Sequence, residues 1–197
     1  MFRPVRSLQV VDPAVKPLLT DDLIPLFDQL FYPSTNTRLI SGDDEPIYLP
    51  ADAVTPFNRL VFAHGFYESA LHEISHWCIA GAERRKLVDF GYWYVPDGRT
   101  ADQQRAFEQV EVKPQAVEWV LSEACGRRFH ISTDNLDGDP EAVEAGRREF
   151  ARRVHAQAHR YLQDGLPPRA ELLKAAFLEF YQRQNVFDEH EFALEQL

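Results

Sequence analysis

Residues 60–80 read LVFAHGFYESALHEISHWCIA, and this stretch predicts a strand, a turn and a helix in succession. The apolar run at its start is typical of a short buried strand, and His64-Gly65 is typical of a turn. Residues Phe66 to Ala80 follow helical spacing, and Gly81 is expected to end the helix at a C′ position. This helix is apolar around much of its circumference, so the polar residues that it carries lie in or near a core.

The pentapeptide His72-Glu73-Ile74-Ser75-His76 lies within this helix. Side chains four residues apart share one helix face, about 5–6 Å apart between Cβ atoms, so two imidazoles can bind one metal ion at about 2.1 Å. Glu73 lies about 100° around the helix and flanks such an ion. In H-E-x-x-H metallopeptidases this position is the general base. The pattern predicts a metal site with Glu73 as a catalytic residue; the alternative is two core histidines satisfied by hydrogen bonds.

Two histidines leave the coordination sphere open, and a carboxylate from a later helix completes it in zinc hydrolases and in non-haem iron sites alike. We prefer Glu111, because it lies just before the proline-marked start of an apolar helical run, where an acidic side chain can turn inward. Glu108, one turn earlier, and Glu118 remain alternatives, and Glu123 is a weaker candidate. Glu111 can also be read as a first-turn carboxylate favoured by the helix dipole.

Other histidines and acidic residues give weaker signals. His155 and His159 also have i, i+4 spacing, but arginines surround them, and we interpret this pair as part of a solvated face. His64 is either a hydrogen-bond donor behind the metal site, a substrate contact, or a satisfied turn residue. The aspartates of residues 134–139 lack the twelve-residue calcium-loop pattern and are assigned to a loop.

The bulk composition bounds the class of protein. A chain of 197 residues, 45% hydrophobic and 26% charged, suits one globular domain spanning residues 1–197. The formal net charge of −10 argues against binding nucleic acid through the overall field. A local positive rim is still possible at Arg84-Arg85-Lys86, although a solvated helix end is the simpler interpretation.

Cysteine usage and hydropathy favour the cytoplasm. Cys78 and Cys125 are far apart in sequence and form no C-x-x-C motif, so we expect no disulfide framework, and Cys78 fills core space. The first residues lack the apolar region of an export signal, and no stretch approaches 18 apolar residues. We therefore expect no membrane span.

The remaining segments predict an α+β fold with a small sheet beside the metal helix and a helical C-terminal half. The first predicted element is a helix that Thr20 caps and that runs to about Phe31, before Pro33. A hairpin of Thr37–Ser41 and Pro46–Leu49 and a strand at Phe90–Val95 are expected next. Thr100 is expected to cap a helix that begins at Ala101 and that Pro114 interrupts or restarts, and two last helices begin near Pro140 and Pro168.

Three stretches in order resemble the elongation factor P hydroxylase family: FAHGFYESALHEISHWCIAGAERR, DFGYWYVPDGRT and FEQVEVKPQAVEW. The resemblance implies hydroxylation of a lysine of elongation factor P that already carries a β-lysyl group. It also implies a fold like that of gluzincin-type metallopeptidases and a 2-His-1-carboxylate set that binds iron. Carried over by motif, that set is His72, His76 and Glu111.

Hydroxylation of an unactivated C–H bond needs a redox-active metal with room for O2. Three facial ligands leave that room, and zinc lacks the redox activity. The chain has no H-x-D or H-x-E tripeptide, so dependence on 2-oxoglutarate is not expected. In a hydroxylase, Glu73 would orient a ligand, gate a proton or contact the substrate ammonium, and Tyr92 or Tyr94 would offer aromatic faces to it. The alternatives are a zinc-dependent peptidase of gluzincin type and a metal-stabilised binding protein without turnover.

Overall fold

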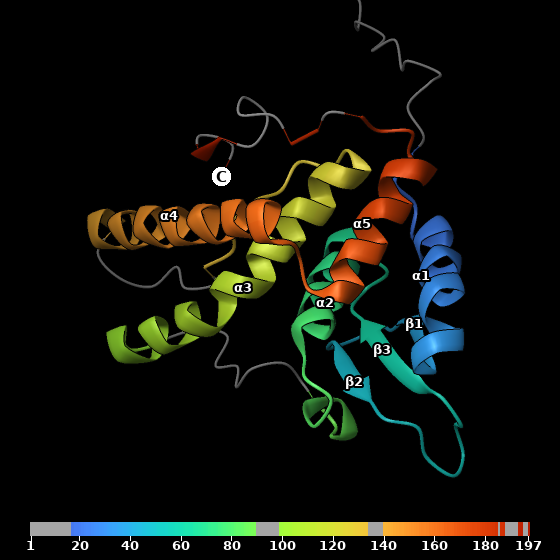
Figure 1. The fold of residues 1–197 in the computed structure, drawn as a ribbon. Helices are drawn as coiled ribbons and strands as arrows, with labels where there is room; N and C mark the ends of the chain where they lie inside the picture. Colours follow the sequence, from blue (N-terminus) through green and yellow to red (C-terminus); the bar gives the residue numbers. More distant parts are fainter. Residues whose placement is uncertain (1–16, 90–98, 134–139, 185, 188–192, 195–196) are drawn as a thin grey trace, which may run out of the picture.

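The computed structural model describes residues 17–89, 99–133, 140–184, 186–187, 193–194 and 197. Three strands form a small sheet in the order β1-β3-β2, with helices packed on it and beside it (Figure 1). The strands are β1 (Thr37–Ser41), β2 (Ile47–Leu49) and β3 (Asn58–Phe62). The helices are α1 (Thr20–Thr35), α2 (Tyr67–Ile79), the 3-10 turn η1 (Arg84–Lys86), α3 (Ala101–Cys125), α4 (Pro140–Asp164) and α5 (Pro168–Phe180). The predicted α+β class is confirmed.

The two strands predicted as a hairpin both form, but they do not pair with each other. β3 lies between them, parallel to β1 and antiparallel to β2. β3 takes the central position because Leu60 and Phe62 are its buried residues and need cover. Gly42 does not make a hairpin turn: its N–H donates to the Phe62 carbonyl, and a Cβ there would lie 2.6 Å from the Val61 side chain. The glycine is needed for this close approach of two backbones.

The free edge of β2 is closed by the chain that follows η1. Tyr48 and Asp89 form an isolated antiparallel bridge in which each backbone N–H donates to the other residue's carbonyl, at 2.7 and 3.0 Å. The Tyr48 hydroxyl also donates to the Arg85 carbonyl, at 3.1 Å. The segment from Arg84 to Asp89 is therefore fixed against the sheet. The strand predicted at Phe90–Val95 lies outside the described residues.

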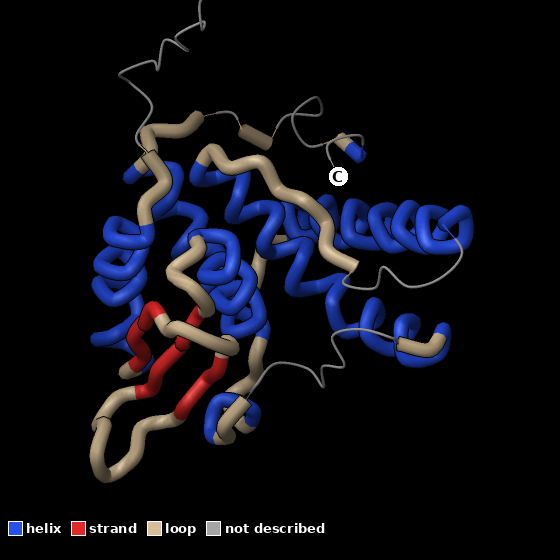
Figure 2. Tube along the Cα trace, turned by 180° about the vertical axis from the view of Figure 1, so that it is seen from behind, coloured by secondary structure: helices blue, strands red, loops and turns tan. Residues whose placement is uncertain are grey.

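Two helices run through prolines that were expected to end or interrupt them. α1 has Leu19 as its N-cap, not Thr20 as predicted; it continues past Pro33 to Thr35, and its C-cap Asn36 has a left-handed φ of 50°. α3 is one helix that contains Pro114 and is closed by Gly126; Figure 1 and Figure 2 show it bending along its length. Each proline removes one backbone hydrogen bond, and packing against neighbouring elements offsets that loss. The predicted cap Thr100 is confirmed, because it forms a capping box with Gln103.

The metal helix α2 lies in the middle of the fold, in contact with β3, α3 and α5. Ala80 is the C-cap, so Gly81 lies at the predicted C′ position, but it does not have the left-handed φ of a glycine cap. Instead Arg169 of α5 donates to the carbonyls of Trp77, Cys78 and Ala80 at 2.6, 3.0 and 2.7 Å. Its guanidinium also lies 4.4 Å from the centre of the Trp77 ring. One partly buried arginine thereby satisfies carbonyls that a helix end leaves open.

Side chains from every described helix except η1 share one hydrophobic core with the sheet. Cys78 is 3% exposed within it, as predicted, and both cysteines are free thiols. α4 and α5 begin at the prolines that were predicted to open them, which confirms the helical C-terminal half. Among the described residues, none of the helices has the length and apolar character needed to cross a membrane.

Candidate metal centre

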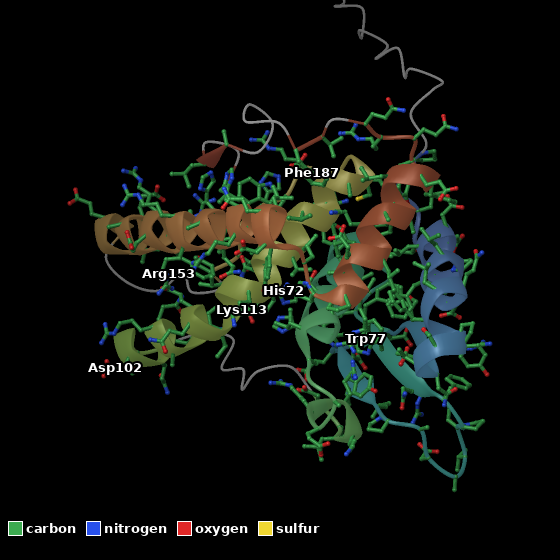
Figure 3. The ribbon with its side chains drawn as sticks, viewed as in Figure 1. His72, Trp77, Asp102, Lys113, Arg153 and Phe187 are labelled. Atoms are coloured by element: carbon green, nitrogen blue, oxygen red, sulfur yellow. The ribbon has the colours of Figure 1, made fainter. Side chains whose placement is uncertain are left out.

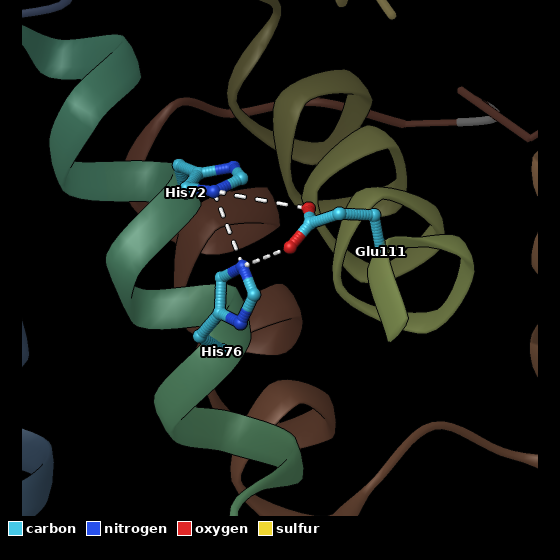
Figure 4. A group of neighbouring side chains, drawn as sticks. All are labelled: His72, His76 and Glu111. Carbon is cyan, nitrogen blue, oxygen red and sulfur yellow. Dashed lines mark hydrogen bonds and ion pairs between the residues drawn. The ribbon is translucent and has the colours of Figure 1, made fainter. Parts of the chain in front are cut away.

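His72, His76 and Glu111 meet where α2 faces α3 (Figure 4). The two histidine Nε2 atoms lie 3.1 Å apart. Glu111 places Oε1 3.2 Å from Nε2 of His76 and Oε2 3.9 Å from Nε2 of His72. Glu111 is 3% exposed, whereas the histidines are partly exposed, so the donors point out of the core toward accessible space. Within the described part of the chain, this is the one group of three such residues close enough to share an ion.

These distances fit a shared metal ion. Two donors that each bind one ion at about 2.1 Å lie about 3.0 Å apart at a right angle and about 3.4 Å apart at the tetrahedral angle. The separations of 3.1, 3.2 and 3.9 Å in this cluster are close to that range. Two imidazoles and one carboxylate are also the donor set of facial-triad iron sites and of many catalytic zinc sites.

Glu118 lies behind His72 and fixes its ring. The His72 Nδ1–H donates to Oε2 of Glu118 at 2.9 Å, which leaves the Nε2 lone pair directed toward His76 and Glu111. Figure 3 shows His72 at the α2–α3 boundary. A carboxylate that accepts from the second nitrogen of a histidine ligand sets its tautomer and raises its basicity. Glu118, predicted as an alternative third ligand, therefore contacts the site through a histidine.

Gln115 holds the carboxylate of Glu111 in place by a hydrogen bond. Its side-chain N–H donates to Oε2 of Glu111 at 3.4 Å and to the Ser132 carbonyl at 2.8 Å. Its side-chain oxygen accepts from the Ser132 N–H at 3.1 Å. Gln115 is 1% exposed, so every polar atom of its amide is used in the interior. This arrangement holds the carboxylate of Glu111 against rotation.

Carboxylates and imidazoles lie close together in this cluster, and their charges shift the pKa values of His72 and Glu111. Burial opposes protonation of His72, but Glu118, Glu73 and Glu111 outweigh it and raise its pKa to about 10. Burial acts to raise the pKa of Glu111, yet hydrogen bonding and charge from the histidines lower it overall. A divalent cation would replace the proton of His72 and the positive charge that comes with it.

The other predicted carboxylate candidates have different partners. Glu108 accepts from Arg153 of α4 at 2.9 Å and from Gln104 at 3.3 Å, so it serves the α3–α4 contact, near Arg153 in Figure 3. Glu123 accepts from Nε1 of Trp119 at 3.3 Å. Glu111 is the candidate that lies with both histidines.

Glu73 is half-buried beside the cluster and makes no hydrogen bond or ion pair with any residue that the structure describes. Burial raises its pKa, the two histidines lower it, and the carboxylates of Glu111 and Glu118 raise it again. Glu73 and His76 line a pocket between α2, β2 and η1. Arg84 and Arg85 line the same pocket, so the arginine run predicted as a possible positive rim does lie beside this site.

The remaining predicted residues fall elsewhere. His155 and His159 are partly buried, not solvated as predicted, because His155 lies 5.8 Å from the buried Trp119 ring. Their Nε2 atoms are 3.1 Å apart. His64 occupies an exposed turn with a φ of 55°. Tyr92 and Tyr94, expected to offer aromatic faces to the substrate, and the loop of residues 134–139 lie outside the described residues.

Sequence reasoning missed two supporting residues. Gln115 was not singled out, although Glu111, Gln115 and Glu118 follow i, i+4, i+7 spacing and so share one face of α3. These polar residues continue into the buried, largely apolar second half of α3, which was a usable signal. Arg169 had no such signal, because its contact with the end of α2 joins residues far apart in sequence.

Comparison with known proteins shows which family this chain belongs to. The model of the family described as elongation factor P hydroxylase matches residues 26–192. A curated protein of Haemophilus influenzae named elongation factor P lysine hydroxylase is 53% identical over 165 residues, which cover 84% of this chain and 90% of the relative. The match includes α2 and α3 and therefore all residues of the cluster. The chain belongs to the elongation factor P hydroxylase family of enzymes.

Proposed function

We propose that this protein hydroxylates the β-lysyl-modified lysine of elongation factor P, with O2 as co-substrate and an iron ion held by His72, His76 and Glu111. The observation that carries the proposal is the His72–His76–Glu111 cluster in a chain of this family. The name of the Haemophilus relative, an elongation factor P lysine hydroxylase, supports the substrate. The donor set supports iron, because it is the facial triad of non-haem iron oxygenases.

The bound iron would supply one-electron chemistry and a place for O2, which no side chain provides. Insertion of one oxygen atom into a C–H bond, with the other atom leaving as water, needs two electrons from a reductant. The absence of an H-x-D or H-x-E tripeptide supports a reductant other than 2-oxoglutarate.

The protein's own residues hold and protect the reacting groups. Glu118 keeps His72 in the tautomer that presents Nε2, and Gln115 keeps the Glu111 carboxylate directed at the histidines. Three ligands on one side leave the opposite side for substrate. Glu73, as the catalytic residue, takes or returns a proton near that side or pairs with a positive group of the substrate.

The peptidase alternative lacks support from the comparisons, which match a hydroxylase family and a lysine hydroxylase. We retain the likeness to gluzincin-type folds as a proposal, supported by an H-E-x-x-H helix packed on a small sheet with a glutamate from a later helix. We also propose that residues 1–197 form one domain and work in the cytoplasm, where elongation factor P acts, without contacting nucleic acid or membrane.

The test is intact mass spectrometry of β-lysylated elongation factor P after incubation with this protein, ferrous iron, a reductant and air. We expect a gain of one oxygen atom that disappears with His76→Ala. Zinc in place of iron should give no gain. Oxygen insertion that persists in His76→Ala would overturn the site; no insertion by an iron-loaded wild-type protein, with cleavage of peptides when zinc is bound, would return the assignment to a peptidase.

A further inference from the structure

The pocket beside the metal cluster has the composition of a binding site for one long polar side chain. It is lined by residues of α2, β2, β3 and η1 and is partly open to solvent. Its apolar part includes Leu60 and Ile79, and Glu73 and His76 connect it to the metal cluster. A ligand seated here would extend directly to the candidate metal.

Two buried donors in this pocket lack acceptors. Nη1 of Arg85 and Nε1 of Trp77 are both buried, and neither has a hydrogen-bond partner among the described residues. Buried N–H groups are nearly always paired, and a missing acceptor is therefore a specific observation that calls for an explanation. A bound carbonyl oxygen would provide it.

The charges of the pocket are balanced except at two residues. Arg84 is paired with Asp89, with Nη2 2.8 Å from Oδ1, so these two side chains neutralise each other. Glu73 makes no ion pair with any described residue, and the Arg85 guanidinium has no carboxylate partner in the same set. The pocket thus offers one negative acceptor beside the metal cluster and one positive donor at η1.

We propose that this pocket binds the acylated lysine side chain of the substrate, with Arg85 and Trp77 donating to its amide carbonyl and Glu73 pairing with one of its ammonium groups. This inference rests on the proposed function. The β-lysyl group joins lysine through an amide and adds two amines, so it carries both features. An unmodified lysine ends in an ammonium group and would lie against the Arg85 guanidinium. Arg85 therefore determines specificity by favouring the acylated side chain and repelling the plain one.

The exposed residues next to Arg85 agree with a protein as the carrier of this side chain. Leu87 and Val88 are 64% and 54% exposed and belong to the segment that Tyr48 and Asp89 fix against the sheet. Exposed apolar side chains on a fixed segment at the edge of a pocket suit contact with a partner surface.

The experiment measures kcat and KM for oxygen insertion into elongation factor P with and without its β-lysyl group. We expect Arg85→Met to raise KM for the modified protein about tenfold to a hundredfold, the usual worth of a hydrogen bond from a charged group, and to reduce the preference over unmodified lysine. Arg85→Lys should restore part of both. Iron content should stay at the wild-type level, and Arg148→Met, an exposed arginine on α4, should match wild type.

Unchanged KM and unchanged preference in an iron-loaded Arg85→Met protein would overturn the inference while leaving the proposed function intact. An iron-loaded wild type that inserts no oxygen into either protein would overturn both. A second measurement avoids reliance on variant folding: a peptide carrying β-lysyl-lysine should inhibit the wild-type reaction at least tenfold better than the same peptide with plain lysine. Equal inhibition by the two peptides would also refute the role of Arg85.

Discussion

The chain has two pairs of histidines with the same spacing and nearly the same geometry, and their surroundings differ. On α2, His72 and His76 place their Nε2 atoms 3.1 Å apart, and on α4, His155 and His159 do the same. The first pair faces Glu111 and Glu118 on α3. In the described part of α3, the Trp119 ring lies beside the second pair.

This comparison separates what helical spacing provides from what a facing element must add. Spacing of four residues brings any two imidazoles within reach of one ion. A third donor comes from another helix, and the group of three that could share one ion among the described residues is the one at the first pair. We therefore expect one metal ion per chain, bound at α2.

The largest effect should follow from removing the carboxylate that distinguishes the two pairs. Glu111→Ala leaves the α2 pair with two ligands, like the α4 pair, and we expect iron binding and oxygen insertion to fall at least a thousandfold, a rough figure for loss of a direct ligand of a catalytic metal. Iron per chain, measured by elemental analysis, and product mass test this. Wild-type activity in the variant would show that Glu111 is no ligand.

A smaller loss should follow when only the support of His72 is removed. Glu118→Gln keeps the shape but weakens the hold on the His72 N–H, and such changes typically reduce metal affinity by about 10–100-fold. Competition with a chelator of known affinity gives the value. Glu108→Gln is the matched control, because Glu108 pairs with Arg153 away from the ion, and it should bind iron normally. Equal affinity in the two variants would contradict the role of Glu118.

The two helices also differ in how they end, and this difference should appear in stability. α4 ends at Gly165, whose φ of 97° lets the backbone close the helix without a contact from another element. α2 depends on Arg169, so Arg169→Met should lower the free energy of unfolding by about 2 kcal/mol, the usual worth of hydrogen bonds from a charged group. Urea unfolding of the metal-free protein measures it. A change within error would mean that water replaces the guanidinium.

The smallest effect is expected at the second pair. His155→Ala removes a side chain next to Trp119, and we expect oxygen insertion to stay within about twofold of wild type and stability to fall by less than about 1 kcal/mol. Iron content and a melting curve test both. Loss of a second equivalent of metal in this variant would show that the α4 pair binds an ion after all.

Local patterns predicted the helices well. The boundaries of α2 differ from the expected ones by one residue at each end, and Thr100, Pro140 and Pro168 open helices as predicted. Capping and apolar spacing are properties of neighbouring residues, so the sequence carries them directly. The errors at Pro33 and Pro114 arose because a local rule was given too much weight against tertiary packing.

Non-local pairings were harder to predict. The hairpin failed because sequence alone does not reveal that β3 inserts between β1 and β2. The meeting of Glu111 with the histidines was expected from the order of motifs, but the distinct partners of Glu108, Glu118 and Glu123 required the relative position of α2, α3 and α4. The sequence alone does not distinguish the four glutamates of α3, because their partners depend on how the helices are placed.

The bridge between Tyr48 and Asp89 limits how a partner protein can approach the metal. Ile47 and Leu49 pair with β3, so Tyr48 is the residue of β2 whose backbone groups face outward, and Asp89 occupies both. Strand addition, the mode by which many peptides bind a sheet edge, needs those groups open. At this edge, beside the pocket, the Tyr48 N–H and carbonyl are therefore not available to pair with the main chain of a peptide. This agrees with our proposal that the substrate inserts a side chain, and the same closure protects this edge of the sheet from edge-to-edge aggregation.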